Sequence, residues 1–276
     1  MEQTSSGKNF TITSQEEVKG TEPPSFRRWL VLATGFFVMF LATGFAFNLA
    51  VLIPELFSSY GKSKAETALV QSITAGMLNI GGTPCGKSVS KYGARVTGIA
   101  GSLLVTIGLV CSFFSTRIPH LVVTLGIISG FGFSAVFVSS LTSVGEYFED
   151  KSKLMALAFI TFGSGCGGIL VPFILDMLIN EYGWKGSLLL MGGLMTHMIC
   201  FFAVCKPIMI GISTTQDSEN ETSSHRPFVN SLKSLVTNAV YIIHVIRVCF
   251  TIPAINSSKI FIIDYLNTNG FKSTSC

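Results

Sequence analysis

Five polar side chains interrupt apolar stretches of the chain, where they could contact a solute or join two helices. They are Asn48, Gln71, Asn79, Ser139 and Ser164. A polar group in a hydrocarbon environment costs free energy, and such groups often mark a substrate pathway or bond across helices. For Asn48 and Gln71 both interpretations stay open, because an amide is hard to hide in lipid. A serine such as Ser139 can instead donate to a carbonyl one turn earlier.

Residue types that perform covalent or metal chemistry form no motif in this sequence. No metal-ligand spacing joins the four histidines, which are His120, His197, His225 and His244. Glycines flank Ser164, but this segment lies inside an expected membrane helix. It is therefore not the strand-to-helix turn of a nucleophile elbow. We expect no enzymatic activity, no cofactor and no metal.

The composition indicates which environment holds these side chains. Hydrophobic residues make up 49% of the 276 positions and charged residues 12%, about half the usual 25% or so of soluble domains. The net charge of +4 is not massed in a basic run, so no nucleic-acid partner is expected. The composition favours an all-α membrane protein whose surroundings are the lipid bilayer.

Six apolar segments are candidates for membrane spans. A hydrocarbon core of about 30 Å needs roughly 20 residues of helix. The expected spans are 29–53, 67–85, 96–114, 121–143, 154–179 and 187–204. Pro54 and Glu55 are expected to end the first span. The short connections predict antiparallel neighbours in a six-helix bundle.

The same pattern divides the chain into four parts. Residues 1–28 are a polar tail without a secretory signal, and residues 29–207 hold the six-helix bundle. Residues 208–234 form a polar linker, and residues 235–276 hold a partial seventh helix and a tail. Arg247, Pro253 and Asp264 interrupt this last apolar segment. It therefore fits a seventh helix, a re-entrant piece or an unstable remnant.

Basic residues predict the orientation, since they favour the cytoplasmic side. Twelve lie before the first span, in alternate loops and after the sixth span: Lys8, Lys19, Arg27, Arg28, Lys87, Lys91, Arg95, Lys151, Lys153, Lys206, Arg226 and Lys233. The other loops hold four, which are Lys62, Lys64, Arg117 and Lys185. The N-terminus, with the linker 208–234, is therefore expected in the cytoplasm.

Glycines spaced four residues apart predict close contacts between helices. The pairs are Gly82 with Gly86, Gly126 with Gly130, and Gly163 with Gly167. Such a pair presents a flat helix face that lets a neighbouring backbone approach. We expect all three pairs to pack against other helices.

Several short motifs resemble a known family. Between Tyr147 and Pro207 the chain carries Tyr147-Phe148-Glu149-Asp150-Lys151, Gly163-Ser164-Gly165, Tyr182-Gly183-Trp184-Lys185, Gly192-Gly193-Leu194 and Lys206-Pro207. These resemble helices 5 and 6 of the monocarboxylate transporter family, a branch of the major facilitator superfamily. Tyr92-Gly93-Ala94-Arg95, preceded by Gly86, resembles the signature loop between helices 2 and 3 of that superfamily. The resemblance covers roughly residues 29–207.

The resemblance implies the N-terminal six-helix bundle of a major facilitator fold, plus part of a seventh helix. It also implies alternating access for a small solute, a monocarboxylate among the candidates, with proton symport in some members. The plasma membrane and an ancillary single-span membrane protein are further implications. One departure concerns the solute: proton-coupled members carry a lysine in the middle of helix 1, where this chain aligns Phe47.

The signature loop has an expected mechanical role. Gly86 and Gly93 permit a tight turn against neighbouring helices. Arg95 is expected to pair with Glu146 and to latch one conformation. The alternative is that Arg95 only anchors the topology.

One bundle cannot enclose a cavity that lies between two bundles. The chain is therefore expected to be an incomplete sequence or a truncated product of a transporter. The alternative function is a non-transporting product that pairs with, and regulates, a full-length relative. A cytoplasmic N-terminus argues against a seven-helix receptor.

Overall fold

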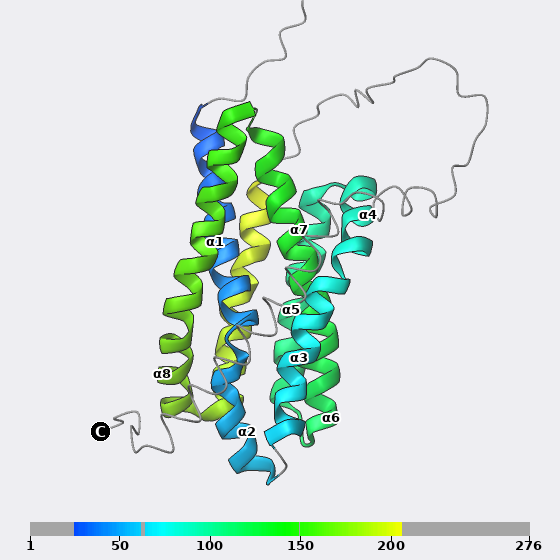
Figure 1. Cartoon of the computed structure of the whole chain (residues 1–276), viewed down its shortest axis with the longest axis vertical. Coiled ribbons are helices and arrows are strands. Elements are labelled where there is room, and N and C mark those ends of the chain that lie inside the picture. The colour runs from blue at the N-terminus through cyan, green and yellow to red at the C-terminus, as the bar shows by residue number, and fades with distance from the viewer. Residues whose placement is uncertain (1–24, 62–63, 149, 206–276) are drawn as a thin grey trace, which may run out of the picture.

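The computed structural model describes residues 25–61, 64–148 and 150–205, and every regular element in these ranges is helical. The elements run as a bundle along the long axis of the molecule (Figure 1). Residues 1–24 of the expected tail, the linker 208–234 and the seventh segment 235–276 lie outside the described residues. The elements are α1 (Ser25–Ala46), η1 (Leu49–Leu52), α2 (Ile53–Tyr60), α3 (Lys64–Ile80), α4 (Gly82–Tyr92), α5 (Ala94–Phe113), α6 (Ile118–Leu121), η2 (Val122–Ile128), α7 (Ser129–Tyr147) and α8 (Asp150–Val204).

Within the described residues, four helices are long and apolar enough to cross a membrane: Phe26–Tyr60, Ala94–Phe113, Ile118–Tyr147 and Ser152–Val204. The last of these contains both expected spans 154–179 and 187–204. The expected span 67–85 is divided at Gly81 between α3 and α4 and is not among the four. The all-α membrane architecture predicted from the sequence is confirmed, although the helices are divided differently.

The first membrane helix is interrupted in its middle and continues beyond its expected end. Its backbone passes from α1 through η1, a 3-10 segment, into α2. The expectation that Pro54 and Glu55 end this span was wrong, because Pro54 lies in the first turn of α2. Proline is well tolerated there, since the N–H that it lacks would have no helical partner. The break falls instead at Phe47 and Asn48.

A sharp turn at Gly183 divides α8 into a first arm, residues 150–182, and a second arm, residues 184–204. The glycine has φ +69° and ψ 169°, a conformation that is essentially restricted to glycine. Trp184, the next residue, donates its Nε1–H to Ser59 Oγ at 3.0 Å. Its ring centroid lies 5.6 Å from that of Tyr60. The Tyr182-Gly183-Trp184 triplet therefore reverses the chain and fastens the second arm to α2.

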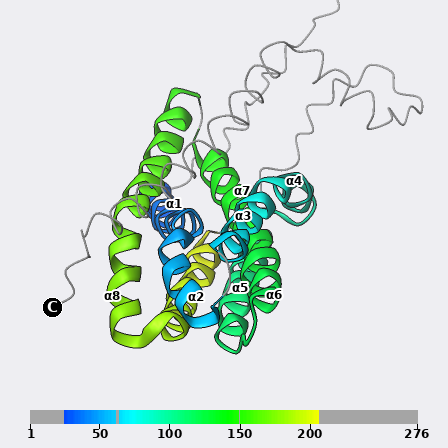
Figure 2. The same ribbon diagram turned by 60° about the horizontal axis from the view of Figure 1, so that its bottom comes forward.

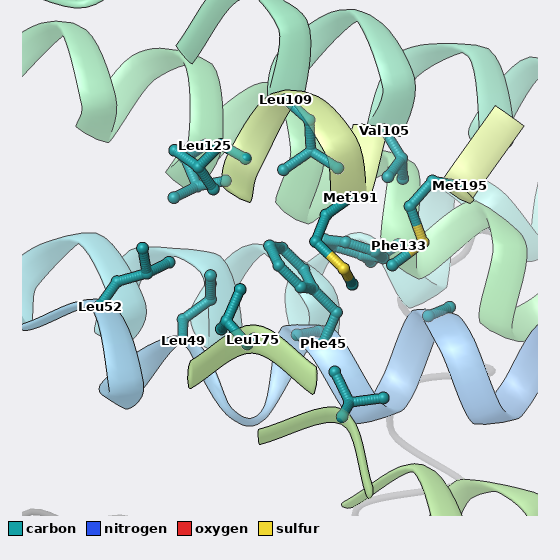
Figure 3. Close-up of a cluster of buried hydrophobic side chains, with 14 of the residues drawn as sticks. Phe45, Leu49, Leu52, Val105, Leu109, Leu125, Phe133, Leu175, Met191 and Met195 are labelled. Atoms are coloured by element: carbon teal, nitrogen blue, oxygen red, sulfur yellow. The ribbon is translucent and has the colours of Figure 1, made fainter. Parts of the chain in front are cut away.

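Apolar side chains from α1, α5, α7 and both arms of α8 form the central core. Figure 3 shows Phe45, Phe133 and Met191 gathered between the helices, with Leu109 beside them. The rings of Phe45 and Phe133 are 6.0 Å apart, and both side chains are buried. This packing sets the positions of the elements that carry the polar candidates.

Two of the three glycine pairs make the close contacts that their spacing predicts. A Cβ on Gly163 would lie 2.8 Å from the carbonyl oxygen of Phe36 in α1, and one on Gly167 would collide with the carbonyl group of Phe40. Gly126 and Gly130 approach α3 in the same way. α1 and the first arm of α8 accordingly run side by side in both views (Figures 1 and 2).

The prediction for Gly82 and Gly86 was wrong. No atom of the described residues lies within 4 Å of a Cβ built on either glycine. Both belong to α4, whose buried residues, Cys85 and Val89, lie elsewhere on the helix. The spacing was present, but no helix packs against that face among the residues that the structure describes.

Candidate functional site

The break in the first membrane helix exposes backbone groups that a continuous helix would pair. The N–H of Phe47 still donates to Thr43 O at 3.1 Å, four residues back, but the N–H of Asn48 donates to Phe45 O at 3.0 Å, three residues back. Non-helical backbone at membrane depth is tolerated only where protein or a water-filled cavity surrounds it. This position is therefore the first candidate for a functional site.

Asn48 occupies the break and is 6% exposed. Its Nδ2 group donates to Gly44 O at 2.7 Å and to Gly168 O in the first arm of α8 at 3.2 Å. The sequence left two interpretations of Asn48 open, a hydrogen bond between helices and a contact with the solute. The bond to Gly168 O is a hydrogen bond between helices.

Gln71 lies on the buried face of α3, together with Thr67 and Thr74, and is 6% exposed. Its Oε1 has no hydrogen-bond partner in the part of the chain that the structure describes. Thr74, one turn later, is satisfied, since its hydroxyl donates to Val70 O at 2.8 Å. A buried acceptor without a partner costs about 1–3 kcal/mol, so Gln71 is an acceptor available for a donor from outside the described chain.

The buried face of α7 carries further unpartnered hydroxyls. Ser139 is 0% exposed, and its Oγ has no partner among the described residues. The same holds for Ser140 on this helix, whereas the buried hydroxyl of Ser134 faces the thiol of Cys85. Ser140 lines a small cavity of about 10 Å³ between α1, α7 and α8, which is room for one water. The sequence interpretation missed Ser134, although its signal, a hydroxyl inside an apolar span, was the same.

The two remaining pathway candidates lie apart from these buried groups. Asn79 is exposed near the end of α3, and its Nδ2 group donates to Ala75 O of its own helix at 2.7 Å. Ser164 is partly buried on the first arm of α8. The structure therefore does not bring all five candidates into one cluster.

The expected conformational loop turns at Gly93, and the latch between Arg95 and Glu146 stays a prediction. Gly93 separates α4 from α5 with φ +83° and ψ 158°, whereas Gly86 lies inside α4. In the described part of the chain no ion pair joins Arg95 to Glu146. Burial raises the pKa of the Cys205 thiol, and the hydrogen bond between Cys205 and Thr34 and the charge of Arg95 counter this in part. Gly98, one turn after Arg95, packs against Phe202 close to the end of α8, so Arg95 lies at that end of the bundle.

Comparison with known proteins agrees with this arrangement. Residues 35–272 match the family model described as the Major Facilitator Superfamily. Monocarboxylate transporter 6 of Mus musculus is 34% identical over 180 residues, which are 65% of this chain and 38% of that protein. Monocarboxylate transporter 12 of Xenopus laevis is 30% identical over 76% of this chain and 45% of its own length. Monocarboxylate transporter 11 of Homo sapiens is 28% identical over 66% of this chain and 38% of its own length. The chain thus spans about two fifths of the length of these relatives.

Proposed function

This chain belongs to the major facilitator superfamily, and we propose that it forms part of a transporter that moves a small organic solute across the membrane by alternating access. Two observations carry the proposal: the first membrane helix is broken at Asn48, and buried polar groups on α3 and α7 lack partners among the described residues. In membrane transporters, discontinuous helices commonly form the substrate site. The residues proposed to line the pathway are Asn48, Gln71, Asn79, Ser139 and Ser164.

The charge of the pathway bears on the class of solute. Between Trp29 and Gly61 the chain has no lysine or arginine, and Phe47 stands where the proton-coupled members carry a lysine. A carboxylate in a low-dielectric site requires a nearby positive charge. We therefore propose an uncharged or zwitterionic small solute first, with a monocarboxylate as the class to compare. Proton coupling is not part of the proposal.

The setting of the proposed transporter follows from charge and resemblance. Loops rich in lysine and arginine support a cytoplasmic N-terminus. The plasma membrane and an ancillary single-span protein are supported by the resemblance alone. The loop of Gly86, Gly93, Arg95 and Glu146 is proposed to rearrange between conformations.

Uptake measurements on a Gln71→Met variant test this proposal. Methionine keeps much of the side-chain volume but removes the unpartnered acceptor, so stability in detergent should be unchanged or raised. If Oε1 accepts a hydrogen bond from the solute, KM should rise. Ser72→Ala is the matched control, because that hydroxyl lies on the same helix, is exposed and donates to Ala68 O of its own helix. An unchanged KM in Gln71→Met would contradict a role for Gln71 in the pathway.

The size of the native polypeptide determines which protein should be used in the uptake assay. An antibody to residues 1–28 would detect either a band near 29.7 kDa or a larger one. If the band is larger, uptake should be measured with that longer protein. A band near 29.7 kDa without uptake would support the alternative, a product that pairs with a full-length relative, and co-purification with that relative would test it.

A further inference from the structure

Two backbone carbonyl groups lose their ordinary helical partners at the contact between α1 and α8. Gly44 O would normally accept from the N–H of residue 48, but that N–H donates to Phe45 O. Gly168 O would normally accept from residue 172, which is a proline and has no N–H. An unsatisfied carbonyl in a membrane interior costs several kcal/mol. Each of these two acceptors is therefore open to a donor other than its usual backbone N–H.

The side chain of Asn48 supplies both donors. Its Nδ2 group carries two hydrogens, and the two oxygens lie 2.7 Å and 3.2 Å from it. The helices are close enough for this because glycines face each other: a Cβ on Gly44 would lie 2.8 Å from the carbonyl carbon of Gly167. One amide thus donates to the free carbonyl at the break in α1 and to the free carbonyl at the proline in α8.

Few other side chains could do the same from this position. A serine can bond the carbonyl four residues back in its own helix, but its single hydrogen cannot serve a second helix as well. An aspartate offers only acceptors when ionised. Among the described residues, the exposed Asn79 donates to Ala75 O within α3 and to no second helix, so an asparagine in a helix does not make this connection by itself.

We propose that Asn48 is a positioning residue that ties the break in α1 to the break at Pro172 in α8. The two discontinuities stabilise each other, and the tie fixes the backbone at Phe47, the neighbouring residue. Its relevance for solute movement rests on the proposed function, whereas the tie itself does not. When one of these helices changes its tilt, the other is expected to follow.

A double-mutant cycle between Asn48→Ser and Pro172→Ala tests the tie on the full chain. The serine keeps a donor for Gly44 O and loses the donor for Gly168 O. The alanine returns an N–H to position 172, which can then satisfy Gly168 O within α8. The melting temperature in detergent should fall in Asn48→Ser alone. In the Pro172→Ala background, the same change should lower it by less than half as much.

A second measurement separates positioning from general stability. The rate at which a maleimide alkylates a cysteine introduced as Phe47→Cys should change several-fold with Asn48→Ser and return toward the starting rate with Pro172→Ala. Asn79→Ser is the matched control and should leave this rate unchanged, with an effect on melting temperature that simply adds to that of Pro172→Ala.

Equal losses of melting temperature in both backgrounds, or an alkylation rate that Asn48→Ser does not alter, would overturn the proposal. If Asn48→Ser alone does not fold, recovery of folded protein in the double variant supports the tie, and failure of both variants counts against it. None of these readouts requires transport. A tie that is present in a protein without uptake would therefore contradict the proposed function and leave this inference standing.

Discussion

Single glycines act in this chain in two separate ways. Gly167 has ordinary helical geometry and serves by its lack of a side chain, since the carbonyl group of Phe40 occupies the space of a Cβ. No described atom lies within 4 Å of a Cβ built on Gly93, but its backbone has φ +83°. The first kind of glycine is required by a neighbour, and the second by its own dihedral angles.

We expect Gly167→Ala to destabilise the chain by about 1–3 kcal/mol, because the added methyl group forces α1 and α8 apart. Thermal unfolding in detergent measures this. Gly165→Ala is the control on the same helix, because no described atom lies within 4 Å of its Cβ position. Equal melting temperatures for the two variants would show that α1 and α8 do not meet at Gly167.

Gly93→Ala should also destabilise the chain, by about 1–3 kcal/mol, because non-glycine residues are strained at this φ and ψ. Gly86→Ala should be neutral or stabilising, since that position is helical with open space around it. The comparison is made by thermal unfolding under identical conditions. A loss in Gly86→Ala as large as in Gly93→Ala would contradict the dihedral explanation.

At the scale of elements, the helices are joined at their interruptions. The break between α1 and η1 meets the proline position of α8 through Asn48. The turn at Gly183 places Trp184 against α2. At an interruption, backbone groups and side chains can form hydrogen bonds outside their own helix. The hydrogen bonds of Asn48 and Trp184 to other helices both occur at such interruptions.

We expect Trp184→Phe to lower stability by about 1 kcal/mol, because the ring remains apolar but its hydrogen bond to Ser59 is lost. The chain has two tryptophans, and Trp29→Phe is the control, since Trp29 is 70% exposed. Thermal unfolding compares both variants with the natural chain. Additivity with Ser59→Ala would indicate that the bond does not form.

At the scale of the whole molecule, the bundle has two ends that differ in charge. α2 ends at one end of the bundle, and α4 lies at the other (Figure 1). α4 carries Lys87 and Lys91, and the first turn of α5 carries Arg95. The orientation proposed from these charges therefore applies to the bundle as a unit.

Two matched cysteine variants test the orientation. Ser58 in α2 and Ser90 in α4 are both exposed, and each hydroxyl donates to a carbonyl of its own helix. We expect a membrane-impermeant maleimide to label Ser58→Cys on intact cells, and Ser90→Cys only after permeabilisation. The natural chain, with its own cysteines, gives the background. Labelling of Ser90→Cys alone on intact cells would reverse the proposed topology.

Some features of this protein could be predicted from local sequence. Apolar segments of sufficient length specify helices in a membrane, because a backbone in lipid must pair its own polar groups. The Tyr182-Gly183-Trp184 triplet was one of the short motifs that indicated the family, and Gly183 is where the chain reverses. These properties depend on residues close together along the chain.

Other features depended on the tertiary structure. Gly163 and Gly167 pack against α1, whereas Gly82 and Gly86, with the same spacing, contact no described helix. The spacing alone does not determine which helix, if any, lies against the glycines. Pro54 began a helix that it was expected to end. Asn48 is adjacent to Gly168 only when α1 lies on α8. Long-range packing, and no local pattern, decides which orphaned carbonyl groups an amide can reach.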